Sequence, residues 1–234
     1  MSSPEQFSAF DLQKLKTHST FDGENNPESS DLEFYRKTWQ SVYDLWRQNA
    51  RTRNVEMPEI VVPSPNISLD ELNEQAVDVE GNRIPTLMMY FPSEFQGKSG
   101  LVALGGIFPE LHSRTIKATT PLENVQEFSG WLNVEAVPEA PYADTDEAQL
   151  REHLDRMGRH GMNENQYILL AYFMKATTGH FIDSRILCRL LGSQMDGYVV
   201  NSRFGPNGDL HVNSHLRPSL RGWELGGRSV KIVD

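Results

Sequence analysis

Residues 167–174 are apolar or aromatic at every position, and this run constrains the fold more than any other feature of the chain. Asn163 and Gln166 have the spacing of a helix capping box just before it, and Gly179 stands where a left-handed residue ends a helix. A strand is the alternative, because aromatic and β-branched residues favour strands, but the caps and the length favour a helix over about 164–178. A helix without a polar face has to be buried on all sides.

The chain has 234 residues, which is long enough to bury a core. Residues 1–30 are rich in Ser, Glu, Asn and Pro, so we expect a flexible N-terminal arm there and a single α+β domain over residues 31–234. The formal net charge of −10 provides no basic field, so we expect no nucleic-acid partner.

Cys188 is the only cysteine, so no intramolecular disulfide can form, and its apolar neighbours favour a buried, unreactive thiol. The first residues lack the basic and apolar parts of a secretory signal, and no window is long and apolar enough to span a bilayer. We therefore expect a cytoplasmic protein without a membrane segment.

A second helical pattern begins where Ser30 and Glu33 have the spacing of a capping box. Its aromatic face contains Tyr35, Trp39 and Trp46. In one interpretation this face docks on the protein's own core; in the other it binds a protein partner.

Turn residues and short apolar runs predict the remaining elements. The predicted strands are residues 59–62, 86–91, 100–108 and 130–136. The predicted helices are residues 68–76, a helix that starts between Asp144 and Glu147 and is closed by Gly161, and residues 184–191 closed by Gly192.

A C-terminal hairpin over residues 198–216 has a loop of Pro206, Asn207 and Gly208, with Gly208 left-handed. This loop pairs Phe204 with Leu210 and gathers the apolar residues on one face, whereas the two-residue alternative would mix the faces. The other face is polar and available to a ligand. It contains Asn201, Arg203, His211, Asn213 and His215.

These elements predict an α+β fold, in which a mainly antiparallel or mixed sheet packs on the buried central helix, with flanking helices and the hairpin. Three successive helices followed by a hairpin do not fit alternating βαβ units.

No metal site or cofactor is predicted. His211 and His215 lie on one strand face but about 13 Å apart, and two ligands of one ion cannot be so distant. His153 and His160 lie two helical turns apart, roughly 10 Å. The glycines near residue 100 match neither a dinucleotide fingerprint nor a phosphate loop.

Two short segments contain the remaining candidates for catalytic or ligand-binding residues. His180 and Asp183 could act as a general acid and base, although Asp183 also suits the cap of the next helix. The turn before Arg228 and Ser229 has two glycines, so its backbone N–H groups with these side chains could hold an anion; turns of this composition are also common without a ligand.

The order of the motifs GWLNVEA, PYADTDE, GRHGMNENQYIL, TGHFID, RLLGS, DGYVVNSRF, GDLHV and LGGRS resembles the C-terminal part of a loosely defined group of bacterial proteins without an assigned function. The resemblance covers about residues 130–234. It implies a bacterial origin and a recurring domain, and it transfers no catalytic residue.

The sequence therefore favours a non-enzymatic binding or protein-interaction domain. The alternative is an enzyme of unknown class that uses His180 and Asp183 with the polar face of the hairpin. Convergence of these residues on one concave pocket would favour the enzyme.

Overall fold

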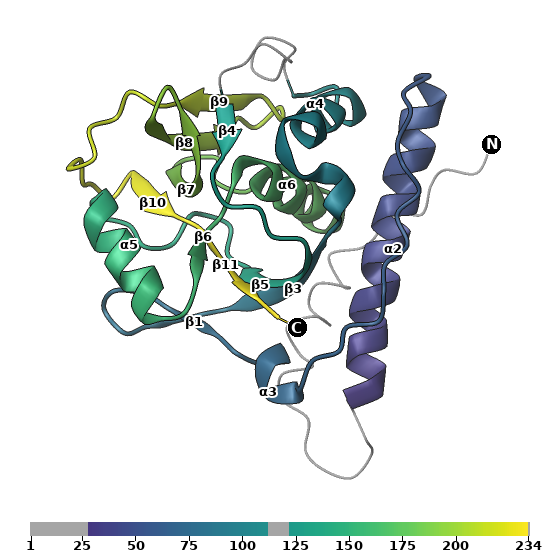
Figure 1. Cartoon of the computed structure of the whole chain (residues 1–234), viewed down its shortest axis with the longest axis horizontal. Helices are drawn as coiled ribbons and strands as arrows, with labels where there is room; N and C mark the ends of the chain where they lie inside the picture. The colour runs from purple at the N-terminus through teal and green to yellow at the C-terminus, as the bar shows by residue number, and fades with distance from the viewer. Residues whose placement is uncertain (1–27, 112–121, 234) are drawn as a thin grey trace.

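The computed structural model describes residues 28–111 and 122–233, which form an α+β fold, as the sequence predicts (Figure 1). The predicted arm lies outside these ranges, except that its last three residues belong to the first described helix. No described helix is both long and apolar enough to cross a membrane. The described helices are α2 (Glu28–Thr52), α3 (Leu69–Leu72), α4 (Gly97–Ile107), α5 (Glu147–Arg156) and α6 (Glu164–Thr178), with a 3-10 turn, η1 (Ser93–Phe95).

The described strands form three sheets. The largest is mixed, with the order β10-β7-β8-β9 and with β4 also paired to β7. The second is antiparallel, with the order β3-β5-β11-β6, and the third pairs β1 with β2. The strand bounds are β1 (Ala76–Val77), β2 (Arg83–Ile84), β3 (Thr86–Phe91), β4 (Leu122–Asn124), β5 (Gly130–Glu135), β6 (His160–Gly161), β7 (Leu187–Met195), β8 (Tyr198–Phe204), β9 (Leu210–Asn213), β10 (Leu225–Gly227) and β11 (Ser229–Ile232).

Helix α6 occupies the centre of the fold. It contacts β3 of one large sheet, β7 and β8 of the other, and α4 (Figure 1). The predicted capping box is present, since Asn163 accepts from the Gln166 backbone and Gln166 accepts from the Asn163 backbone. Gly179 is left-handed with a φ of 79°. Every residue from Tyr167 to Met174 is buried, as a helix without a polar face requires.

Helix α2 runs along one side of the molecule and packs its aromatic face inward (Figure 1). The Trp39 ring stacks on Phe173 of α6 with centroids 4.1 Å apart, and its indole N–H donates to the Met88 carbonyl of β3 at 2.8 Å. Trp46 is also buried, and Tyr35 packs against the same core. Of the two interpretations of this face, docking on the protein's own core is the one that the structure supports.

Helix α2 begins at Glu28, so Ser30 lies inside the helix and not at the predicted cap.

The strand predicted over residues 100–108 is wrong, because this segment is helix α4. Leu101, Leu104 and Ile107 are buried at helical spacing. Three glycines in a short apolar run lower the helix propensity, so the sequence favours a strand over the helix that forms. Gly100 is needed for packing, since a Cβ there would lie 2.2 Å from the backbone of Phe95.

The helix predicted over residues 184–191 is also wrong, because residues 187–195 form strand β7. This strand pairs with β8, β10 and β4, and both of its faces are covered. A short apolar run buried on both faces has no strand periodicity that would distinguish it from a helix. Gly192 lies in β7 and does not end a helix; a Cβ there would be 2.6 Å from the Gly161 carbonyl oxygen.

Smaller boundaries also differ from the predictions. Residues 59–62 form no strand, because their backbone pairs with a side chain: Gln40 donates to the Ile60 carbonyl and accepts from the Val62 N–H. Helix α3 has the predicted Ser68 cap but ends at Leu72. Helix α5 is capped by Asp146 and ends at Arg156, and Gly161 belongs to β6. Strands β3 and β5 match the predictions closely.

The hairpin has the predicted register over the length of β9. Phe204 pairs with Leu210 and Ser202 with Val212, and Gly208 has a φ of 88°. Strand β9 ends at Asn213, so the pairing predicted beyond it does not form.

We expect Leu170→Ala to lower the free energy of unfolding by about 2–5 kcal/mol, the range for buried leucines. Leu170 is fully buried in α6, so its truncation removes apolar contacts and leaves a cavity in the core. Urea denaturation measures the change, and a loss below about 0.5 kcal/mol would contradict the central position of α6.

We expect Gly208→Val to destabilise the protein by more than the roughly 1 kcal/mol of a positive φ alone. A Cβ at Gly208 would lie 2.9 Å from the Phe181 ring and 3.0 Å from the Glu110 side chain. Asn207→Asp is the control, since either side chain suits the turn. Equal denaturation midpoints for the two variants would contradict this account of the loop.

Candidate functional site

The structure separates His180 from Asp183. His180 is exposed, and its backbone bonds with Thr178 in the segment after α6. Asp183 is fully buried, and both of its carboxylate oxygens accept from Arg228. The two residues therefore do not form an acid and base around one substrate position.

Asp183 and Arg228 form a buried ion pair. The Arg228 Nε and Nη2 atoms each lie 2.8 Å from one Asp183 oxygen. The remaining guanidinium donors reach the carbonyls of Glu135 and Val137. Burial acts against the charge of the guanidinium, but Asp183 outweighs it and raises the pKa of Arg228. Arg228 is therefore a structural cation and is not free to hold an anion.

Ser229 belongs to a second buried group next to this pair. Its hydroxyl donates to the Glu135 carboxylate, and its N–H donates to the other Glu135 oxygen at 2.9 Å. Tyr142 also donates to Glu135, at 2.9 Å. Arg159 lies 3.4 Å from that carboxylate and donates to Ser229 and Asn133. We call these residues and the Asp183–Arg228 pair the buried polar cluster.

The buried polar cluster is closed to solvent. Asp183 and Arg228 are 0 % exposed, and Glu135 and Arg159 are at most 2 % exposed. Burial, followed by the nearby Glu135 charge, raises the pKa of Tyr142, so its hydroxyl stays a hydrogen-bond donor. A substrate could not reach these groups, and we assign them to the stability of the fold.

Cys188 is buried as expected, and burial raises the pKa of its thiol.

The polar face of the hairpin is only partly open. Arg203 and His211 are exposed and directly opposite each other, and His215 is exposed beyond the end of β9. Asn201 is 2 % exposed and lies opposite Asn213. The neighbouring strand β7 places Arg189 beside Asn201, and Arg189 donates to the carbonyls of Thr145 and Leu220. Four of the five predicted residues thus lie in two facing pairs, His215 lies beyond the strand, and none of the five lines the groove described below. Within residues 28–111 and 122–233, no group of three or more His, Cys, Asp or Glu residues could hold a metal ion.

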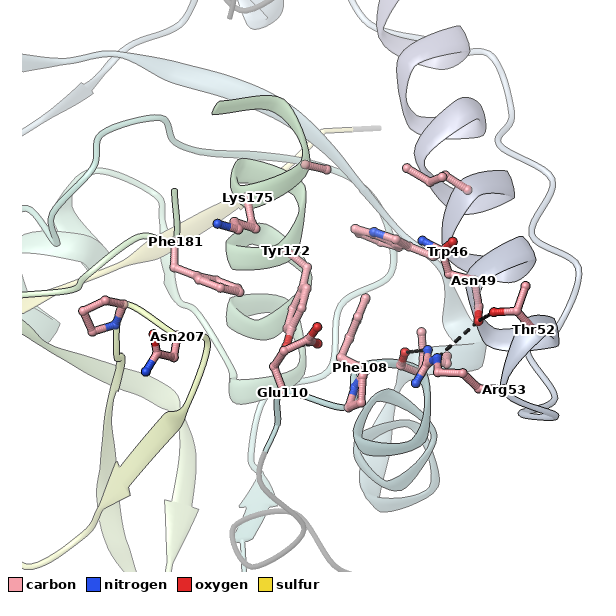
Figure 2. A pocket seen from close by; sticks show the side chains of 15 residues that line it. Trp46, Asn49, Thr52, Arg53, Phe108, Glu110, Tyr172, Lys175, Phe181 and Asn207 are labelled. Atoms are coloured by element: carbon pink, nitrogen blue, oxygen red, sulfur yellow. Dashed lines mark hydrogen bonds between the residues drawn. The ribbon is translucent and has the colours of Figure 1, made fainter. Parts of the chain in front are cut away.

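A groove elsewhere on the molecule is a better candidate site. It lies where the C-terminal turns of α2, α4 and α6 come together with the loop of the hairpin, and it has a volume of about 700 Å³ (Figure 2). Its lining comes from segments far apart in the sequence. The lining residues used below are Trp46, Arg53, Phe108, Glu110, Tyr172, Lys175, Ala176 and Phe181.

Aromatic rings form the wall of the groove (Figure 2). Phe108 stacks on Tyr172 with centroids 3.7 Å apart. Trp46 meets Phe108 edge-on at 5.0 Å, and Phe181 meets Tyr172 edge-on at 5.2 Å. Each ring is held by its neighbours, so this wall is preformed for an apolar ligand.

Three charged side chains lie along the groove (Figure 2). Arg53 donates to the carbonyl oxygens of Asn49 and Ile107, at the ends of α2 and α4. Lys175 donates to the Gly179 carbonyl at 2.6 Å. Glu110 accepts from the Tyr172 hydroxyl at 3.3 Å, and it makes no ion pair with a described residue. Apolar walls with a few fixed polar groups are typical of sites for small organic molecules.

The groove is not evident from the sequence. The helical pattern identifies Trp46 as a possible partner contact, but no motif gives Glu110, Lys175 or Phe181 a role. The available signal was an aromatic residue near the end of each of three helices, namely Trp46, Phe108 and Tyr172. That signal is weak until the fold brings the three helix ends together.

Glu164, the first residue of α6, is the remaining buried acid with unusual electrostatics. One oxygen accepts from the Ser202 hydroxyl at 2.7 Å, and the other has no hydrogen-bond partner among the described residues. Burial raises the pKa of Glu164 from 4.5 to about 7, and the Ser202 bond opposes this only partly. Because the residue is closed to solvent, we treat it as a determinant of stability.

We expect the stability of the protein to fall as the pH rises from about 5 to about 8, in part through Glu164. Between the unfolded pKa of 4.5 and the folded pKa of about 7, the folded carboxyl keeps a proton that the unfolded carboxyl has lost. Glu164→Gln cannot titrate, so the free energy of unfolding of the wild type should fall by up to about 3 kcal/mol relative to this variant. The exposed Glu152 gives the control, Glu152→Gln. If the wild type and Glu164→Gln change in parallel across this pH range, the assignment is wrong.

Comparison with known proteins gives no match to a protein-family model, to a curated protein or to a solved structure. The resemblance of residues 130–234 to a group of bacterial proteins is therefore still a prediction. The function has to be argued from the groove and from the chemistry of its walls.

Proposed function

We propose that this protein is a non-enzymatic binding protein and that the groove between the ends of α2, α4 and α6 binds a small organic molecule. The observation that carries the proposal is the preformed aromatic wall of Trp46, Phe108, Tyr172 and Phe181 beside a cavity of about 700 Å³. Sites for small molecules typically have volumes of about 300–1,000 Å³.

The placement of the other polar residues supports binding rather than catalysis. Asp183 and Ser229 are bonded inside the buried polar cluster, and His180 is exposed and away from it. The groove itself contains a carboxylate, a lysine and an arginine, and among the described residues that line it there is no histidine, cysteine or serine. Such groups can orient a ligand, and they do not form a nucleophile with an adjacent base.

The hairpin loop belongs to the same site. Pro206 and Asn207 line the groove, and Gly208 packs tightly against Phe181 and Glu110. The loop therefore holds one end of the aromatic wall in place. This contact explains how a tight turn far from α2 contributes to the shape of the groove.

Ala176→Trp provides the test, because Ala176 lines the groove and a tryptophan there would fill it. The probe is 2-phenylethanol, followed by two-dimensional NMR of the backbone amides. We expect it to shift the amides of residues 108–110 and 172–176 in the wild type and to leave Ala176→Trp unchanged.

The matched control is Ala148→Trp, which places the same side chain at an exposed position of α5. It should bind the probe like the wild type. Shifts that map away from the groove, or equal binding by both tryptophan variants, would overturn the proposal. Circular dichroism checks that both variants are folded.

A further inference from the structure

The charged side chains around the groove differ in how many partners they have within the described part of the chain. Arg53 donates to three carbonyl oxygens, those of Asn49, Gly106 and Ile107. Lys175 donates to the Gly179 carbonyl and lies 5.4 Å from the centre of the Phe181 ring. Both cations therefore already have partners in the protein, and an anionic ligand would have to compete for them.

Within the described part of the chain, the negative charge of the groove has fewer partners than these cations. Glu110 is exposed, and within the described part of the chain its only hydrogen bond is the 3.3 Å contact with the Tyr172 hydroxyl. Figure 2 shows its carboxylate beside Tyr172 and Phe108, in the middle of the groove. A ligand that lies against the aromatic wall would therefore meet this carboxylate.

Three helices end at the groove. Its lining includes Thr52 at the end of α2, Ile107 at the end of α4, and Lys175 and Ala176 in the last turn of α6. The C-terminus of a helix carries about half a negative charge, because its last carbonyls lack partners within the helix. Arg53 and Lys175 alone would outweigh the roughly one and a half negative charges of the three helix ends, and only with Glu110 does the sum become about half a negative charge.

The half-buried Phe181 ring favours the same sign of charge, whereas Trp46, Phe108 and Tyr172 are at most 6 % exposed and present little free ring face. The faces of tryptophan, tyrosine and phenylalanine rings attract cations, and Lys175 already lies over Phe181 in this way. The net charge of −10 also favours the approach of a cation over that of an anion.

We infer that the ligand of the groove is a cation, an amine or quaternary ammonium on an apolar body, and that Glu110 is its counter-ion. This inference rests on the proposed function and defines the class of its ligand. The apolar body fills the groove beside Phe108, Tyr172 and Phe181, and the ammonium group lies between Glu110 and the helix ends.

Three probes with the same phenyl group test the sign of the charge: 2-phenylethylammonium, 2-phenylethanol and phenylacetate. Their affinities are measured by NMR titration at neutral pH and low salt. We expect the ammonium probe to bind about fivefold tighter than the alcohol, and phenylacetate to bind more weakly than both. Phenylacetate binding as tightly as the ammonium probe would overturn the inference.

Glu110→Gln should remove the preference for the ammonium probe, so that the ratio of its affinity to that for 2-phenylethanol, both measured in this variant, falls from about five to about one. Glu152→Gln, on the exposed face of α5, changes the net charge equally and should keep the preference. A preference that persists in Glu110→Gln would also overturn the inference. If 2-phenylethanol binds in the groove but the charge has no effect, the proposed function holds and the cationic ligand is wrong; if none of the three probes binds, both fail.

Discussion

The burial of α6 on every side is the constraint on which the rest of the structure depends. Residues 167–174 offer no polar face to water, so the two large sheets, α4 and the aromatic face of α2 have to cover them. The burial extends to the polar start of the helix. Glu164, Asn165 and Gln166 are also closed to solvent, and they bond to Ser202, to the Phe95 carbonyl and to the Asn163 backbone. The need to cover one helix thus determines where the surrounding elements lie.

The buried polar cluster follows from the same arrangement. A buried ion pair contributes little net stability unless every donor and acceptor has a partner, and breaking one side of it is costly. The Asp183–Arg228 pair meets that condition, and Ser229 and Glu135 join β11 to β5 beside it. Residue types that suggest chemistry in a sequence can therefore serve to hold neighbouring strands of a sheet together.

Local signals predicted some elements well. Helix α6, strands β3 and β5 and the hairpin register are determined by caps, apolar runs and turn residues that are close in sequence. The segments at 100–108 and 184–191 were assigned wrongly, because packing partners far along the chain decide their conformation. The groove could not be predicted for the same reason: Trp46, Glu110 and Phe181 become neighbours only when three helix ends and a hairpin loop meet. The sequence suggested Asp183 as an acid or base and Arg228 as an anion ligand, whereas the fold pairs the two with each other.

Strand β11 lies between β5 and β6, inside the second sheet, although it is synthesised after every other described element. Until β11 is added, one edge of β5 is open, and the backbone groups of β5 and β6 that face β11 lack their hydrogen-bond partners. A nascent chain therefore contains the apolar surface of α6 before it contains the strand that closes the sheet beside it. Folding of this protein should be governed by long-range pairing late in synthesis, and chaperones that cover apolar surface on the ribosome would act during that interval.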